Sequence, residues 1–382
     1  MAQRRRRRTT EQVSIADQFK QTSEKRIIEP RKIDPDKLIP SGLTLLNCHC
    51  SGTPTGAYGL GKITTVPGGS SSGKTIFLLT TFAESNLLSR LDGYDFIYDD
   101  VEEALEFDLS YLFGPDTASR IKAPNYDGNE PVYSDTIQDL ESNILRRCKD
   151  KSCKPFLYVC DSLDALTSEE ELEREYKNAL KRIVSDEHLE AVKQSYQTEK
   201  AKIIGRTLRM IKRELKKTNS SLILIQQIRD KIGVAYGKKT TTSGGRAPFF
   251  YSSHQIWLSK IKPIKNKDIK IGTQVHVEIT KNKLNGKERE IDYANIYYDY
   301  GIDDIESCVR FLCEEWWPNA KDEKGKIKKG TWYAVELGWE GSRASLIDKI
   351  ESEDAIKEVR ELVGKAWHQK EESVRLNRKR RF

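Results

Sequence analysis

Apolar and helical segments alternate along the chain between about residues 37 and 300. Three short apolar runs end in polar residues: YDFIYDD (94–100), FLYVCDS (156–162) and SLILIQQ (221–227). Such runs indicate buried strands, and their alternation with helical patterns predicts an α/β core with a mainly parallel sheet. Ligands of open α/β sheets lie at the carboxyl ends of the strands, so we expect these terminal Asp and Gln residues to face one.

Three further patterns predict a strand and two helices. Residues 274–280 alternate with period two, as in a half-buried strand, through Val275, Val277 and Ile279. The charged stretch 168–217 has an apolar helical face in its second half, formed by Ile204, Leu208, Ile211 and Leu215. We interpret the basic residues around that face as an ordinary solvated surface. A final helical run spans 351–363.

The chain divides into four predicted segments. Residues 1–36 form a basic tail and a polar, helical arm, which is too short to be stable alone and is expected to pack on another body, such as a neighbouring subunit. Residues 37–300 form the α/β core. Residues 301–374, crowded with aromatic side chains, form a small α+β domain, and 375–382 are a second basic tail.

The net charge of +7 comes from the two tails. Arg4 to Arg8 supply five positive charges and 375–382 supply five more, with no acid in either segment, so the remainder carries 7 − 10 = −3. Nucleic-acid binding by the body must therefore come from local patches. The tails either stay solvated or add sequence-independent attraction to phosphate backbones.

Composition favours an intracellular protein with a real core. The 382 residues are 37% hydrophobic, but no apolar stretch is long enough to span a bilayer, and no apolar signal region follows the N-terminal arginines. We expect no membrane association and a cytoplasmic location. The seven cysteines show no disulfide framework or doubled zinc-site spacing, so we expect reduced, mostly buried thiols.

The sequence VPGGSSSGKT at 66–75 matches the phosphate loop G-x-x-x-x-G-K-T. Glycines let consecutive backbone N–H groups turn toward phosphate oxygens, while the lysine reaches the β- and γ-phosphates and the threonine hydroxyl ligates Mg²⁺. An apolar strand before the loop and a helix after it support this interpretation. The predicted cofactor-binding residues are Gly68, Gly69, Ser70, Ser71, Ser72, Gly73, Lys74 and Thr75.

Acidic and amide side chains at the predicted strand ends supply the remaining chemistry of γ-phosphate hydrolysis. Asp161 is placed to hold Mg²⁺ together with Thr75, and Glu102 to polarise the attacking water as a general base. Glu103 and Asp100 are alternatives to Glu102. Gln227 ends the third strand, where it could sense the γ-phosphate.

The segment after Gln227 is rich in Gly, Ser, Thr and positive charge. Between 229 and 246 one acid, Asp230, stands against five basic residues: Arg229, Lys231, Lys238, Lys239 and Arg246. Its attachment to Gln227 suggests a ligand site whose order depends on ATP.

Six ordered motifs resemble the RecA recombinases: GGSSSGKT, DDVEEALE, VCDSLDALT, LILIQQIRDKIGVAYG, TTTSGGRAPFFYSS and VEITKNKLNG. The resemblance is strong over about 38–300 and weak beyond it, through the run at 341–363. It implies a RecA-like P-loop NTPase core that uses ATP and Mg²⁺. It also implies polymerisation into a helical filament on DNA.

The resemblance assigns roles by position. Glu102 matches the catalytic glutamate, Asp161 the Walker B aspartate and Gln227 the γ-phosphate switch glutamine. Lys281 and Lys283 match paired lysines that reach a neighbouring subunit's ATP. Such charges would stabilise the transferring phosphoryl group and tie hydrolysis to assembly.

The resemblance also implies two DNA-binding loops. Residues 229–250 match the second, in which Gly244 and Gly245 let backbone amides approach phosphates and Phe250 links the loop to the subunit interface. The first is expected within about 169–202, a stretch that is longer than usual.

Departures from the family pattern suggest a divergent, phage-borne member. Phe249 and Gln255 stand where bacterial members commonly carry a lysine and an arginine. The adenine-stacking tyrosine has no clear counterpart, which leaves Phe107 and Tyr111 as candidates. The basic tail 375–382 replaces an acidic tail that restrains DNA binding in bacterial members.

These features together predict an ATP-dependent recombinase that forms filaments on single-stranded DNA and exchanges strands with homologous double-stranded DNA. A loading or mediator protein is a further candidate partner, and the location is a bacterial cytoplasm or a phage-infected host cell. Two rivals remain: a ring helicase or loader of the same fold, and a mediator that hydrolyses ATP weakly.

Overall fold

The computed structural model describes residues 33–184, 196–230, 240–242 and 244–378. Met1–Asp34 and Pro35–Phe382 are separate units, and every element below belongs to the second. The helix predicted near 10–25 lies outside the described residues.

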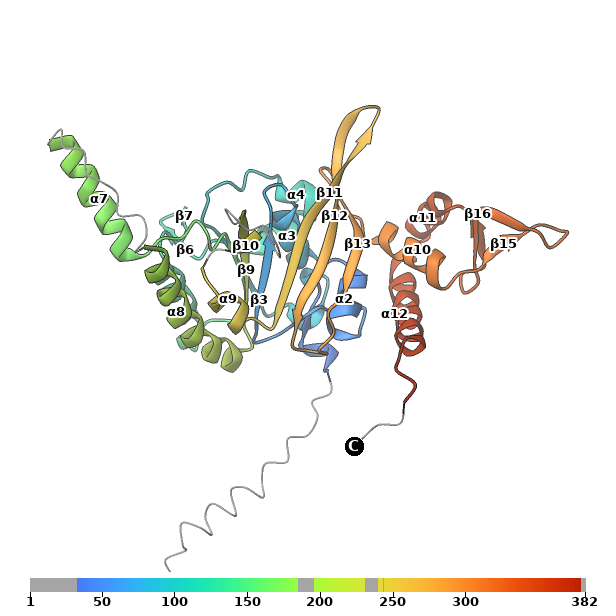
Figure 1. Ribbon diagram of the computed structural model, residues 1–382, viewed down its shortest axis with the longest axis horizontal. Coiled ribbons are helices and arrows are strands. Elements are labelled where there is room, and N and C mark those ends of the chain that lie inside the picture. The colour runs from blue at the N-terminus through green and yellow to red at the C-terminus, as the bar shows by residue number, and fades with distance from the viewer. Residues whose placement is uncertain (1–32, 185–195, 231–239, 243, 379–382) are drawn as a thin grey trace, which may run out of the picture. The chain divides into compact units, whose positions relative to one another are not determined.

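A ten-stranded sheet forms the core, in the order β14-β13-β12-β11-β3-β9-β8-β4-β5, with β10 beside β9 (Figure 1). Strands β11, β3, β9, β8, β4 and β5 run parallel, while β12, β13 and β14 extend the sheet antiparallel. The bounds are β3 Ile63–Gly68, β4 Asp95–Asp100, β5 Ile121–Lys122, β8 Phe156–Asp161, β9 Ser221–Asp230, β10 Thr240–Thr242, β11 His254–Asn266, β12 Ile269–Asn282, β13 Glu290–Tyr297 and β14 Gly301–Ile302. The three strands predicted from apolar runs are therefore confirmed as the neighbours β4, β8 and β9.

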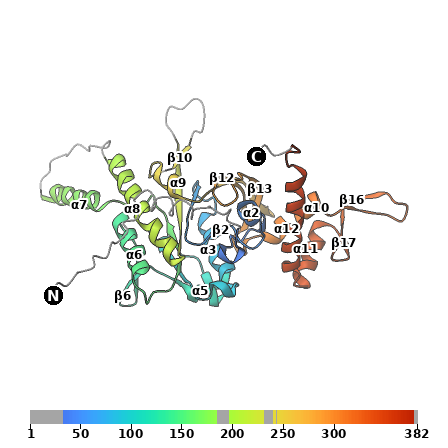
Figure 2. The same ribbon diagram turned by 90° about the horizontal axis from the view of Figure 1, so that it is seen from below.

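Helices cover both faces of the sheet because its buried strands place side chains alternately on the two faces. In β8, Leu157 and Val159 face the cluster built on α2 (Thr44–Ser51) and α3 (Lys74–Asn86). Phe156, Tyr158 and Cys160 face the cluster that includes α6 (Ile137–Lys149) and α8 (Tyr196–Thr218) (Figure 2). The apolar face predicted at 204–215 is confirmed, since its four side chains are buried in the second cluster.

The remaining elements before β11 are mostly short. They are η1 Pro35–Lys37, β1 Leu38–Ile39, β2 Tyr58–Gly59, η2 Ser89–Leu91, α4 Leu109–Phe113, α5 Pro115–Arg120, β6 Asn125–Asp127, β7 Glu130–Val132, α9 Ala247–Tyr251 and the longer α7 Glu169–Val184. The period-two pattern at 274–280 lies in β12 and buries Val275, Val277 and Ile279, as predicted.

All seven cysteines are free thiols and five are buried. No helix in the described ranges is long and apolar enough to cross a membrane.

The last fifth of the chain adds three helices and a three-stranded sheet among its described residues. They are α10 Asp304–Glu315, β15 Asn319–Lys321, β16 Ile327–Ala334, β17 Trp339–Gly341, α11 Arg343–Ser352 and α12 Ile356–Ser373. The prediction of a single helix at 351–363 is wrong. Asp354 takes a left-handed conformation (φ 52°), so α11 ends at Ser352 and α12 starts afresh at Ile356. The division between core and small domain at about 300 stays a prediction.

A hydrogen-bonded charge network joins α12 to the core. The Arg360 guanidinium contacts Glu84 of α3 at 2.7 and 3.0 Å and Asp304 at 2.8 Å. Asp304 also accepts hydrogen bonds from the backbone N–H and the hydroxyl of Thr44, both at 2.7 Å. Burial lowers the pKa of Arg360, but these carboxylates raise it by more. The guanidinium therefore stays protonated.

We predict that Arg360→Ala lowers the free energy of unfolding by about 2–4 kcal/mol, because it leaves two carboxylates partly buried without their cation. Arg375→Ala, which breaks the exposed pair with Glu372, should change it by less than about 1 kcal/mol. Urea unfolding followed by tryptophan fluorescence measures both. Equal effects of the two substitutions would contradict a structural role for this network.

Candidate functional site

The phosphate loop connects the end of β3 to the start of α3. Gly73 has a left-handed backbone (φ 82°), and a Cβ atom there would lie 2.4 Å from Ile296 Cδ1, so only glycine fits. The Lys74 ammonium donates a hydrogen bond to the Gly69 carbonyl at 2.7 Å. The Ser72 hydroxyl donates to the same oxygen at 2.9 Å. The loop is therefore closed by its own side chains.

Two cavities flank this loop. One, of about 210 Å³, contains the side chains of Lys74, Thr75, Glu102, Asp161 and Gln227 along its wall, together with Ser70 and Ser71. The other, of about 280 Å³, lies against Ser71 to Ile76, the strand residues Lys270, Thr273 and Ile296, and Tyr298, which follows β13. The predicted loop residues thus separate an acidic chamber from a more apolar one.

The structure distinguishes the two aromatic candidates. Phe107 lines both cavities. Tyr111 lines neither and is 68% exposed. Tyr298, which was not predicted from the sequence, shares the apolar chamber with Phe107, because it directly follows β13, whose Ile296 lines the same chamber.

Asp161 is held by two hydroxyl groups. Thr75 donates to its Oδ2 at 2.8 Å, and Tyr98 of β4 donates to the same atom at 2.6 Å. Burial raises the pKa of Asp161 and lowers that of Lys74. A hydroxyl and a carboxylate at this distance form a hard oxygen pair, the donor set that suits Mg²⁺. Tyr98 was missed because only the pairing of β4 with β8 brings it there.

Glu102 and Gln227 meet although they lie 125 positions apart. The Gln227 side-chain amide donates to Glu102 Oε1 at 2.8 Å, and the Ser162 hydroxyl donates to the same oxygen at 2.6 Å. The Gln227 backbone N–H donates to Asp164 Oδ2 at 2.7 Å. Sequence reasoning predicted the first pair of residues separately and missed Ser162 and Asp164.

The alternatives to Glu102 have other surroundings. Asp100 lines the acidic chamber, but its Oδ2 accepts the Leu105 backbone N–H at 2.8 Å and so stabilises the turn. Glu103 is exposed and does not line the chamber. The geometry therefore favours Glu102 among the three.

Lys281 and Lys283 do not join the phosphate loop of their own chain, since they line neither cavity. The Lys281 ammonium donates to the carbonyls of Phe249 and, at 3.2 Å, of Phe250, while Lys283 donates to Phe250 at 3.5 Å. Burial, together with the charges of Lys283 and Lys212, lowers the pKa of Lys281 to about 8.

The predicted DNA-binding residues are described only in part. Gly244 and Gly245 have left-handed backbones (φ 77° and 70°), and added Cβ atoms would approach Ile204 and Ala201 of α8. Backbone conformation and packing on α8 are therefore enough to explain glycine at both positions. Arg246 and Phe250 are exposed around α9. Arg229 pairs with Thr241 through the β9–β10 ladder. Its side chain, and Lys231, Lys238 and Lys239, lie outside the described residues.

Gln255 is buried, and its side-chain oxygen accepts hydrogen bonds from Trp257 and Thr280 at 3.1 and 3.0 Å, so this position offers no exposed surface to DNA. The first DNA-binding loop, expected within about 169–202, stays a prediction. Helix α7 covers 169–184 and α8 begins at Tyr196, and residues 185–195 lie outside the described residues.

A parallel α/β sheet with a phosphate loop at a strand end, and acids from neighbouring strands beside it, defines the P-loop class of nucleotide-binding proteins. The RecA N-terminal domain family matches residues 13–303. The chain belongs to the RecA recombinase family, and the resemblance seen in its motifs is confirmed.

Two relatives named RecA agree with this membership. "Protein RecA" from Ehrlichia ruminantium (strain Gardel) is 31% identical over 267 residues, which cover 70% of this chain and 65% of that protein. The chain therefore spans slightly less than two thirds of that relative. "Protein RecA" from Aquifex aeolicus (strain VF5) is 29% identical over 342 residues, 88% and 87% of the two chains. The crystal structure of the RadB recombinase aligns over 70% of this chain and 99% of its own, with 18% identity and a TM-score of 0.45.

We predict that Lys281 titrates near pH 8 and that Lys283→Gln raises its pKa, because burial of Lys281 remains but the substitution removes the larger of the two neighbouring positive charges that lower it. Lys328→Gln, a distant lysine, should leave it unchanged. The pKa of Lys281 is lower in the folded state than in the unfolded state, so between about pH 8 and 10.5 the unfolded chain binds more protons. The contribution of Lys281 to the free energy of unfolding therefore rises with pH over this range. The pH dependence of acetylation at each lysine, read by mass spectrometry, tests this; titration of Lys281 near 10.5 in the unaltered protein would contradict it.

Proposed function

We propose that this protein is an ATP-dependent DNA recombinase. It forms helical filaments on single-stranded DNA in the cytoplasm and promotes pairing and strand exchange with homologous double-stranded DNA. The observation that carries the proposal is the Gln227–Glu102 hydrogen bond, which links the acidic chamber to the strand that leads into the basic segment 229–246. Family membership supports it independently.

The loop residues Gly68 to Thr75 would cradle the triphosphate of ATP. Lys74 and Thr75 now contact Gly69 and Asp161, so both side chains must exchange these partners for phosphate and metal. Mg²⁺, when bound, would neutralise charge on the β- and γ-phosphates, and Thr75 with Asp161 would hold it. The apolar chamber beside Phe107 would take the adenine.

Glu102 would act as the general base in hydrolysis. Its Oε1 is occupied by Ser162 and Gln227, which fix the orientation of the carboxylate and leave Oε2 for a water molecule. Gln227 cannot contact a γ-phosphate without altering this arrangement. Its rotation would couple the presence of ATP to β9 and to the DNA-binding segment that contains Gly244, Gly245 and Arg246.

Lys281 and Lys283 would complete the catalytic site of a neighbouring subunit. They line no cavity around their own phosphate loop, and their present partners are the carbonyls of Phe249 and Phe250. A cation supplied by the neighbour would stabilise the transferring phosphoryl group only after assembly, which makes turnover depend on the filament.

We predict slow ATP hydrolysis without DNA and strong stimulation by single-stranded DNA. Glu102→Gln should lower the stimulated rate about 10²–10⁴-fold, because it removes the base. Lys281→Ala should abolish stimulation, and Lys328→Ala, a matched exposed lysine, should retain it. Phosphate release at fixed protein concentration measures all four proteins.

Equal slow turnover with and without DNA would favour the weakly hydrolysing mediator. Unchanged turnover in Glu102→Gln would show that another acid, such as Asp100, is the base.

We also predict that Phe107→Ala weakens ATP binding about five- to tenfold, through lost aromatic contact with the base. Tyr111→Ala should have little effect, because this side chain lines neither cavity. Calorimetric titration with a slowly hydrolysed ATP analogue compares the two. A larger loss in Tyr111→Ala would reverse the assignment.

A further inference from the structure

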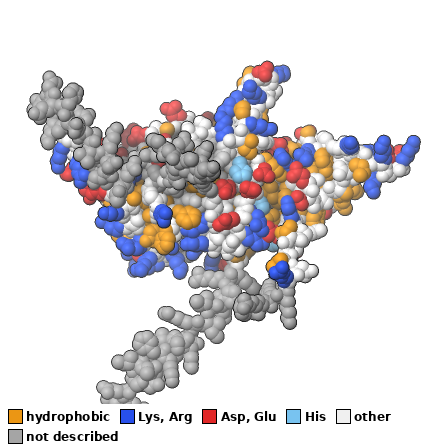
Figure 3. Space-filling view, in the orientation of Figure 1, with side chains coloured by type: hydrophobic (Ala, Val, Ile, Leu, Met, Phe, Trp, Pro, Cys, Tyr) orange, Lys and Arg blue, Asp and Glu red, His pale blue; other side chains and the backbone are white. Residues whose placement is uncertain are grey.

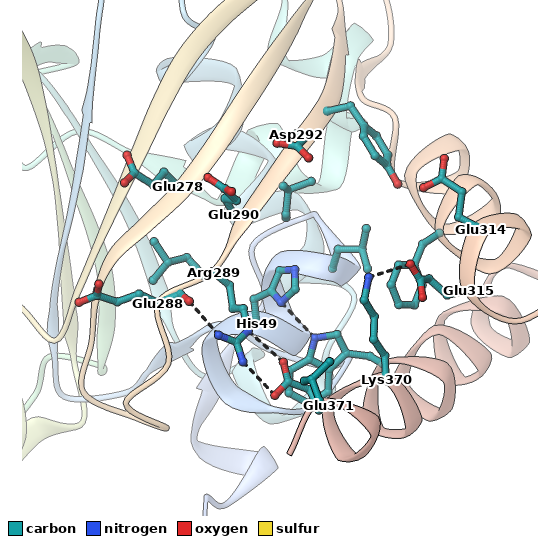
Figure 4. Close-up of a pocket in the computed structure, with 17 residues that line it drawn as sticks. His49, Glu278, Glu288, Arg289, Glu290, Asp292, Glu314, Glu315, Lys370 and Glu371 are labelled. Carbon is teal, nitrogen blue, oxygen red and sulfur yellow. Dashed lines mark hydrogen bonds and ion pairs between the residues drawn. The ribbon is translucent and has the colours of Figure 1, made fainter. Parts of the chain in front are cut away.

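A larger cavity of about 660 Å³ lies away from the phosphate loop, bounded by α2, β12, β13, α10 and α12 (Figure 4). Seven of its lining residues are acidic, and only Arg289 and Lys370 are cationic; 7 − 2 leaves a net charge of −5. Burial lowers the pKa of His49 to about 4, so the histidine is neutral. We call this cavity the acidic pocket. Figure 3 shows acidic side chains gathered between the sheet and the C-terminal helices.

The two cations of the acidic pocket are already paired. Arg289 contacts both oxygens of Glu371 at 3.0 and 3.1 Å, and Lys370 contacts Glu315 at 2.7 Å. Glu288, Glu290 and Asp292 have no lysine or arginine within 4.0 Å in the described part of the chain. Among the basic side chains of the described residues, Glu290 and Asp292 lie within 4.0 Å of His276 alone, each at 3.6 Å. Three carboxylates, two near the start of β13 and one just before it, therefore have no lysine or arginine partner among the described residues.

The floor of the pocket is apolar. Ile291 and Trp367 are buried there, and the Trp367 indole N–H donates to His49 Nδ1 at 3.0 Å, which fixes the ring. A ligand that fits this pocket carries several positive charges at its rim and an apolar group for the floor.

The C-terminal tail has this composition and starts at the pocket. Val374, the C-cap of α12, lines the cavity. The eight residues after it, RLNRKRRF, carry five positive charges, no acid and a terminal phenylalanine. Eight extended residues reach about 26–29 Å, enough to turn back from the end of α12 over the pocket.

We propose that the acidic pocket binds the chain's own C-terminal segment 375–382. Arg375 is paired with Glu372 outside the pocket, so the contacts to Glu288, Glu290 and Asp292 come from the four cations at 378–381, and Phe382 packs on the apolar floor. A docked tail would withhold its cations from nucleic-acid phosphates; only this consequence rests on the proposed function, and the binding site does not.

Zero-length carbodiimide cross-linking of the full chain tests the docking directly, because Lys379 is the one lysine of the tail. We expect a bond from Lys379 to Glu288, Glu290 or Asp292, found by mass spectrometry. The Lys370–Glu315 pair, at 2.7 Å, is the internal control. Formation of the control cross-link alone would overturn the proposal. Cross-links between isotopically labelled and unlabelled chains would assign the tail to a second copy and overturn docking within one chain.

Limited trypsin digestion of the tail gives a second readout. Removing three charges with Glu288→Gln, Glu290→Gln and Asp292→Asn should speed cleavage after Arg378 about tenfold. The control variant Glu323→Gln, Asp348→Asn and Glu353→Gln removes the same charge from exposed positions elsewhere and should match the unaltered chain. Equal cleavage rates in all three proteins would contradict the proposal, and neither readout involves ATP or DNA.

Discussion

The parallel alignment of β3, β4, β8 and β9 is the constraint on which the candidate site depends. Gly68 stands opposite Gln227 across the β3–β9 ladder, and Asp100 stands opposite Asp161 across β4–β8. Side chains alternate between the two faces of a strand, so a shift of one residue would turn Asp161 away from Thr75 and into the core. The buried apolar residues of these strands prevent that shift. The same packing that stabilises the core thus fixes the relative positions of loop, acid and switch residue.

The carboxylates of the site accept hydrogen bonds from neighbouring side chains of the same site, and this shapes how the site can respond to a ligand. A carboxylate removed from water is costly unless it accepts hydrogen bonds. Asp161, which is half-buried, accepts two from Thr75 and Tyr98, and the exposed Glu102 accepts two from Ser162 and Gln227. A triphosphate would compete for these donors, and a cation would compete with them for the carboxylate oxygens. Rearrangement at Gln227 would then follow from ligand chemistry, because turning its side-chain amide toward a phosphate would break its hydrogen bond to Glu102.

Features that depend on residues close together in the sequence could be predicted, and those that depend on contacts between distant segments could not. The phosphate loop and the apolar strands β4, β8 and β9 were found because each is a contiguous pattern. Tyr98, Ser162 and Tyr298 were missed, since their approach to the loop depends on strand pairing between distant segments. The run at 351–363 misled for the opposite reason: helical residues continue through it, but Asp354 is left-handed and divides it into two helices. The burial of Gln255 could not be deduced because its partner Thr280 lies on another strand.

The central claim is that hydrolysis and DNA binding in this chain serve strand exchange, and joint-molecule formation tests it most directly. The unaltered protein, ATP and Mg²⁺ are incubated with circular single-stranded DNA and a linear duplex that is either homologous or unrelated. A recombinase yields joint molecules with the homologous duplex alone. Unwinding of both duplexes would indicate a motor, and no joint molecules despite DNA-stimulated hydrolysis would contradict the claim.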